Sequence, residues 1–88
     1  MKEFLYKGKR HQFISLYELP YSVKVKKFLK KFALFYSNRA YLPVSVLDIL
    51  KKYDFRLRKC ERLKASNPFV KLLFAQLESE IRRVYEKL

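Results

Sequence analysis

Lysine side chains recur between residues 22 and 38 with a spacing that would place them on one side of a helix. At about 100° per residue, five lysines face away from the apolar residues of this stretch: Lys24, Lys26, Lys27, Lys30 and Lys31. No acid occurs between Glu18 and Asp48, so the lysines lack the opposite charges that would meet them three or four residues away. Lysine is a flexible point charge suited to phosphate groups. We therefore predict that this lysine row binds a polyanion.

Other cations and several tyrosines extend the predicted nucleic-acid interface. The link around the only glycine, Gly8, carries Lys7, Lys9 and Arg10. Four cations further along the chain are expected to enlarge the patch: Arg39, Lys52, Arg56 and Lys59. Three tyrosines lie beside cations in expected linkers and are candidates for stacking on bases: Tyr6, Tyr21 and Tyr41.

The residue types most often used in catalysis are few and scattered. The only histidine, His11, lies in a basic run whose charges disfavour its protonated form, and we expect it to contact phosphate or water rather than act as a base. The only cysteine, Cys60, falls on an apolar stripe and is predicted to be a small buried side chain. Because no metal-binding cluster and no glycine-rich phosphate loop occurs, we predict a protein that is not an enzyme and has no metal or cofactor.

The overall charge points to the same class of partner. The chain has 88 residues, expected to form one domain, with 21 Lys and Arg against 8 Asp and Glu and a net charge of +13. Residues 1–39 hold ten of the cations but only two of the acids. Repulsion on this scale opposes folding, and a polyanionic partner is a common reason to retain it.

The composition also bears on the cellular compartment. A single cysteine excludes an internal disulfide, which is typical of a reducing environment. No stretch approaches the roughly 18 apolar residues that a membrane span requires, so no integral membrane insertion is expected. We predict a cytoplasmic protein, or one located in a host compartment that contains nucleic acid.

The apolar spacing predicts a mainly α fold, a compact three-helix domain that follows a short basic N-terminal segment, residues 1–21. The three helices are expected near residues 22–38, 45–64 and 67–88. Ser45 followed by Asp48 resembles a capping box, and Asn67 before Pro68 is a strong start for the last helix. Five phenylalanines at helical spacing are expected to pack in the core: Phe28, Phe32, Phe35, Phe69 and Phe74.

The N-terminal segment has two alternative interpretations. One is a β-hairpin whose tip is the basic link at 7–10, because β-prone runs flank Gly8. In the other, residues 11–19 form a short helix that ends at Pro20. With the lysine helix, this second arrangement would look like a helix-turn-helix pair.

These features predict a small basic nucleic-acid-binding protein that contacts phosphates, with DNA favoured over RNA and a regulatory or architectural role. The main alternative is a basic protein-interaction module, an adaptor or inhibitor that docks on an acidic protein. A third is attachment of the lysine helix to an anionic membrane surface. The apolar seam of residues 67–88 is typical of a coiled-coil-like helix and could also form a homodimer.

Overall fold

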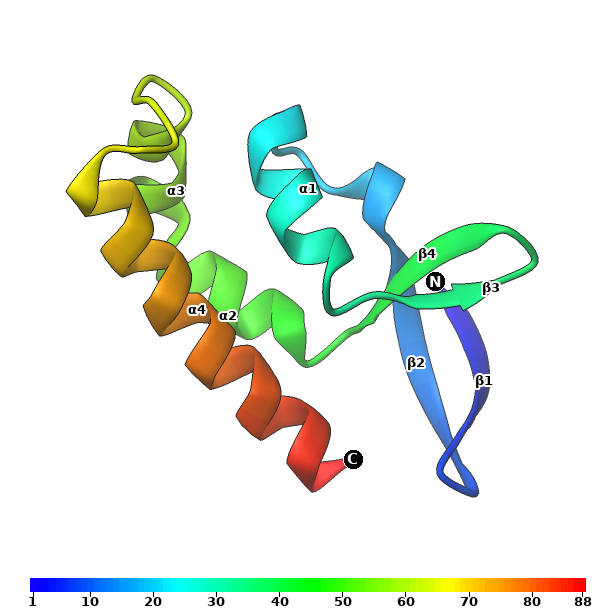
Figure 1. Cartoon of the computed structure of the whole chain (residues 1–88). Helices are drawn as coiled ribbons and strands as arrows, with labels where there is room; N and C mark the ends of the chain where they lie inside the picture. Colours follow the sequence, from blue (N-terminus) through cyan, green and yellow to red (C-terminus); the bar gives the residue numbers. More distant parts are fainter.

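The computed structural model describes all 88 residues and has an α+β fold. Its elements, in chain order, are β1 (Lys2–Tyr6), β2 (Lys9–Ser15), η1 (Leu16–Glu18), α1 (Val23–Lys30), β3 (Leu34–Tyr36), β4 (Arg39–Pro43), α2 (Val46–Lys52), α3 (Asp54–Cys60) and α4 (Pro68–Lys87). The prediction of a mainly α, three-helix domain is therefore wrong. The chain forms a four-stranded antiparallel sheet as well as the helices (Figure 1).

Two tight hairpins supply the four strands. The turn Lys7–Gly8 joins β1 to β2, and the turn Ser37–Asn38 joins β3 to β4. All four turn residues have positive φ, between 52° and 80°, as two-residue type I′ turns require, and this turn type matches the twist of the flanking strands. The hairpin alternative for residues 1–21 is confirmed. The helix over 11–19 is wrong, and the helix-turn-helix arrangement fails with it.

The pairing of β2 with β4 joins the hairpins into one sheet of order β1-β2-β4-β3. Ala40 and Leu42 of β4 point to one face, where both are buried in the main core. The opposite face carries a separate aromatic cluster formed by Phe4, Phe13, Tyr36 and Tyr41. The sheet is curled so strongly that the rings of Phe4 on β1 and Tyr36 on β3, the two edge strands, stack with centroids 5.1 Å apart.

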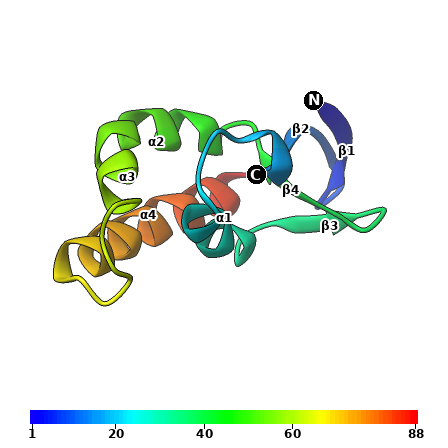
Figure 2. The same cartoon turned by 90° about the horizontal axis from the view of Figure 1, so that it is seen from above.

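The main core lies between the sheet and the helices and contains 18 buried residues. The long helix α4 packs against α2 and α3, and α1 lies between α3 and the sheet in both views (Figures 1 and 2). The rings of Phe28 on α1 and Phe74 on α4 stack at 4.3 Å between centroids. This contact ties the lysine helix to the C-terminal helix.

Helix α4 is the element that the sequence predicted best. Asn67 accepts a hydrogen bond from the backbone N–H of Phe69 at 2.8 Å, and Pro68 occupies the first turn. The apolar seam is buried within the same chain: Val70, Leu73, Leu77 and Ile81. The core positions predicted for Phe28 and Phe32 are confirmed, and Phe69 and Phe74 pack against the core from partly buried positions.

The other two predicted helices differ from the structure. The lysine helix ends at Lys30 instead of continuing to residue 38, so Phe35 lies on a strand and is 63% exposed rather than in the core. The predicted helix 45–64 breaks at Tyr53 into α2 and α3, and Ser45 makes no capping bond. A short apolar run fits both helical and strand periods, and pairing with β4 selects the strand. None of the helices is long and apolar enough to cross a membrane.

Replacing Gly8 should test the N-terminal turn. Gly8 has φ of +80°, and no heavy atom lies within 4 Å of the place that a Cβ would occupy, so Gly8→Ala should be opposed by backbone conformation alone. We expect the free energy of unfolding to fall by about 1 kcal/mol, measured by urea denaturation. Lys9→Ala, an exposed change beside the turn, should alter it by less than about 0.5 kcal/mol. Equal stability of Gly8→Ala and the natural protein would contradict this turn geometry.

Candidate nucleic-acid interface

Three of the four lysines of α1 lie on its outer side, as their spacing predicts: Lys26, Lys27 and Lys30. Val25, Phe28 and Leu29 are buried, whereas Lys27 and Lys30 are exposed, with Lys26 half-buried beside them and Lys31 exposed just past the helix end. The structure has four ion pairs, and none of them includes a lysine from residues 24–31. The pairs are Arg10–Glu3, Lys52–Glu80, Arg58–Asp54 and Arg82–Glu78. The α1 lysines therefore have no acid in contact. We call Lys26, Lys27, Lys30 and Lys31 the lysine face.

Lys24 does not belong to this face, although the sequence placed it there. Its ammonium donates to the backbone carbonyl of Cys60 at 3.2 Å and to that of Leu63. Cys60 is the last residue of α3, and its carbonyl also accepts from the backbone N–H of Leu63. Leu63 lies in the turn that follows the helix. Lys24 thus fastens α1 to α3, and its charge is directed into the protein.

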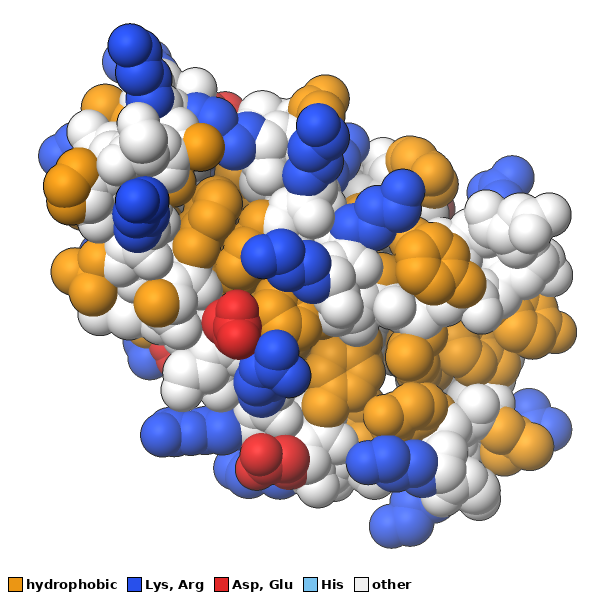
Figure 3. Space-filling view, viewed as in Figure 1, with side chains coloured by type: hydrophobic (Ala, Val, Ile, Leu, Met, Phe, Trp, Pro, Cys, Tyr) orange, Lys and Arg blue, Asp and Glu red, His pale blue; other side chains and the backbone are white.

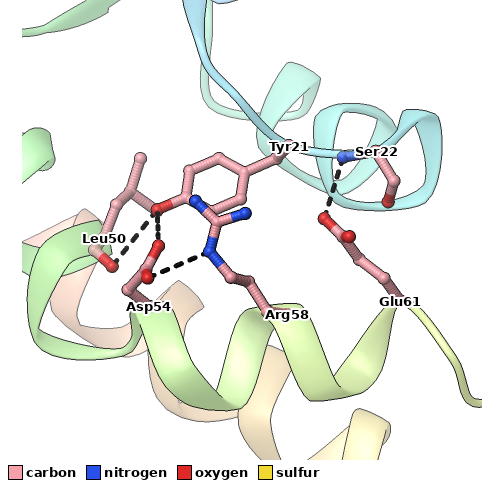
Figure 4. Close-up of polar contacts among 6 residues, drawn as sticks. All are labelled: Tyr21, Ser22, Leu50, Asp54, Arg58 and Glu61. Atoms are coloured by element: carbon pink, nitrogen blue, oxygen red, sulfur yellow. Dashed lines mark hydrogen bonds and ion pairs between the residues drawn. The ribbon is translucent and has the colours of Figure 1, made fainter.

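A second set of bonds holds the start of α1 against α3 (Figure 4). The Tyr21 hydroxyl donates to Asp54 at 2.9 Å, and the Arg58 guanidinium donates to the other oxygen of that carboxylate at 3.1 Å. The backbone N–H of Ser22 donates to Glu61 at 3.0 Å. These contacts fix the direction in which the lysine face points.

The environment of this network changes the pKa of its members. Burial, followed by the hydrogen bond to Asp54, raises the pKa of Tyr21 to about 12. The hydroxyl of Tyr21, and then the Arg58 guanidinium, lower the pKa of the Asp54 carboxyl. Both groups therefore keep the donor and acceptor states that the bond requires throughout the neutral range.

A groove brings together cations from three distant segments. Lys7 from the first turn, Lys31 from the end of α1 and Arg82 from α4 line it, and Phe32, Tyr85 and Glu86 complete the lining. The Arg82 guanidinium lies over the Phe32 ring, 5.6 Å from the centroid, and the Tyr85 hydroxyl donates to the backbone carbonyl of Phe32. We call this the α1–α4 groove. Lys7 and Lys31 were predicted binding residues, whereas Arg82 was missed because acids surround it in the sequence.

The remaining predicted cations lie outside this groove. Lys9 is exposed on the first hairpin, and Arg10 pairs with Glu3 at 3.5 Å. Arg39, the first residue of β4, lines a separate hollow together with Lys2, Glu18 and Tyr41. Figure 3 shows Lys and Arg side chains spread widely over one face, with few acids between them. The predicted patch is therefore divided among several areas.

Helices α2 and α3 carry the last three predicted cations: Lys52 on α2, and Arg56 and Lys59 on α3. Lys52 and Arg56 lie over the Tyr53 ring at 5.4 and 5.3 Å from its centroid, and Lys52 also pairs with Glu80 at 3.3 Å. Lys59 lies over the Phe69 ring at 5.1 Å. Lys52 is thus partly neutralised by contact, while Arg56 and Lys59 have aromatic neighbours and no acidic partner.

The three tyrosines proposed for base stacking are engaged within the protein. Tyr41 is 7% exposed in the aromatic cluster, and Tyr21 is held by Asp54. Tyr6 is half-buried and meets the Tyr85 ring edge-on, with centroids 6.0 Å apart. The most exposed aromatic side chain is instead Phe55 on α3, at 82%. Sequence reasoning missed it, although residue 55 falls on the same side of the helix predicted for residues 45–64 as Lys52 and Lys59, three residues before it and four after it.

Replacing Lys24 should affect stability more than replacing a lysine of the lysine face. Lys24→Met removes the hydrogen bonds that the carbonyls of Cys60 and Leu63 accept from Lys24, and we expect the free energy of unfolding to fall by about 1 kcal/mol. Lys27→Met, on the exposed side of the same helix, should change it by less than about 0.5 kcal/mol. Urea denaturation of both variants measures the difference, and equal effects would show that Lys24 has no structural role.

The raised pKa of Tyr21 gives stability a dependence on alkaline pH. Between the ordinary pKa of 10.0 and about 12, the folded protein keeps a proton that the unfolded chain releases, so the free energy of unfolding falls as pH rises. Tyr21→Phe has no such proton and should lose stability less steeply across this window. Because Tyr53 and Tyr85 remain in both proteins, the difference isolates Tyr21. Parallel curves from urea unfolding at several pH values would contradict the network.

The other candidate chemistries of the chain are limited. Cys60 is fully buried, as predicted, and burial raises the pKa of its thiol. No group of three or more His, Cys, Asp or Glu side chains is placed to hold a metal ion. Comparisons of the chain with protein-family models, with curated proteins and with solved structures found no match.

Proposed function

We propose that this protein binds nucleic acid through the phosphate backbone, using the lysine face and the α1–α4 groove. The observation that carries this proposal is that no lysine of α1 contacts an acid, in a chain with a net charge of +13. An ordinary exposed surface mixes charges of both signs. Cations left without partners can each displace a counterion from a phosphate backbone, which drives association.

The residue types favour contacts with phosphates over reading of bases. Base edges are usually recognised by Arg, Asn or Gln in bidentate geometry, whereas the lysine face contains only flexible ammonium groups. Arg82, the one guanidinium in the α1–α4 groove, already pairs with Glu78 at 3.2 Å. Binding with little sequence preference suits an architectural role, and DNA is the first polymer to test.

The test compares two triple variants that remove the same charge from different places. The lysine-face variant replaces Lys27, Lys30 and Lys31 by Ala. The control variant replaces Lys51, Lys71 and Lys87 by Ala. All six side chains are exposed and none has an acidic partner. Binding to duplex DNA is measured by fluorescence anisotropy across a salt series, with circular dichroism to verify folding.

With about six phosphate contacts, from the lysine face together with Lys7 and Arg82, the natural protein should show a log–log salt slope of about −5. Loss of three contacts should make the slope of the lysine-face variant shallower by about 3, while the control variant keeps most of the original slope. Equal losses in the two variants would assign binding to net charge and overturn the lysine face as the contact surface. Absence of binding by the natural protein near physiological salt would overturn nucleic-acid binding itself.

A protein-interaction module is the second candidate, and one observation favours it. Val23 lies among the lysines of α1 and is 72% exposed, which suits an acidic protein surface with an apolar spot better than a phosphate backbone. This candidate predicts a stoichiometric complex with an acidic protein and little affinity for random DNA. A homodimer through residues 67–88 stays a prediction, and it would have to use faces other than the seam that the chain's own core already covers.

A further inference from the structure

One face of α3 combines an exposed ring with several cations. Phe55 is 82% exposed, and it lines a hollow together with Arg58, Lys59 and Arg62. Arg58 and Lys59 lie three and four residues after Phe55 on α3, so they share its side of the helix. Arg62 follows in the turn after α3 and lines the same hollow. We call this set the α3 platform.

The cations of the α3 platform differ in whether an acid contacts them. Arg58 is held by Asp54 at 3.1 Å, so an acid in contact offsets its charge. Lys59 and Arg62 have no ion-pair partner. Two cations without acidic partners therefore line the same hollow as the exposed ring, Lys59 one helical turn away on α3 and Arg62 in the turn that follows the helix.

The ring is also carried by a well-anchored element. Figure 4 shows Asp54 and Glu61, at the two ends of α3, bonded to Tyr21 and Ser22. Lys24 donates to the carbonyl of Cys60, the last residue of the same helix, and to that of Leu63 in the turn that follows it. A lone exposed phenylalanine is common on protein surfaces, but one on a fixed helix with cations on the same face has the parts of a base-stacking site.

We propose that the α3 platform binds an unpaired nucleobase on the Phe55 ring, while Lys59 and Arg62 contact the neighbouring phosphates. The ligand class is single-stranded nucleic acid, and this inference rests on the proposed nucleic-acid binding. In a duplex the base faces are covered by their neighbours, so the ring has no face to stack on. A single flat ring between cations matches one base and its phosphates better than it matches an apolar strip on an acidic protein.

The chain contains no tryptophan, which permits a direct test. Phe55→Trp introduces one indole at the platform, and Phe35→Trp introduces one at another exposed position, 63% exposed on β3. Each variant is titrated with a single-stranded oligodeoxynucleotide and with the matched duplex. Stacking on a base should quench the fluorescence of the Phe55→Trp variant with the single strand and leave the Phe35→Trp variant nearly unchanged.

Removal of the ring supplies an independent readout. Phe55→Ala should weaken binding of the single strand by about 5- to 150-fold, with duplex binding nearly unchanged, both measured by fluorescence anisotropy. If the oligonucleotide binds but the Phe55→Trp variant is not quenched and Phe55→Ala binds normally, the platform is overturned and phosphate binding stands. If the natural protein binds neither polymer, the proposed function fails as well.

Discussion

The pairing of β2 with β4 is the interaction on which the rest of this fold depends. It consists of only three residue pairs, Phe13 with Pro43, Ile14 with Leu42 and Ser15 with Tyr41, but it joins two ribbons that would be marginal alone. It places Leu42 in the helical core and the Phe13 and Tyr41 rings on the opposite face. Because β2 leads into α1 and β4 into α2, the pairing also determines where the helices begin.

The cations of this chain have two different uses. Lys24 holds α1 against α3 by donating to backbone carbonyls, whereas Arg58 pairs with Asp54 within α3 and lies over the Tyr21 ring, 5.7 Å from its centroid. The lysine face is kept clear of acids and directed outward by that same attachment. The net charge of +13 as a whole is distributed over a body of 39 × 24 × 18 Å, and ions in physiological salt screen exposed charges that lie more than about 8 Å apart.

The two proposed binding surfaces use different chemistry on neighbouring elements. The lysine face and the α1–α4 groove present charge with few exposed rings, which suits the outside of a duplex. The α3 platform adds a ring to its cations, which suits an exposed base. Since Tyr21, Ser22 and Lys24 connect α1 with α3, both surfaces are held in one fixed relation to each other.

Features that depend on local chemistry could be predicted from the amino-acid sequence: the lysines without nearby acids, the capped start of α4 with its buried seam, and the burial of Cys60. The hairpin at Gly8 was one of two alternatives. Long-range packing determines that residues 34–43 pair as strands, that the second predicted helix breaks at Tyr53, and that Lys7, Lys31 and Arg82 line one groove. The reason is the range of the forces. Capping and helical periodicity act within a few residues, whereas a three-residue strand forms only where another strand supplies its hydrogen bonds, and side chains from distant segments meet only after the sheet and helices have packed.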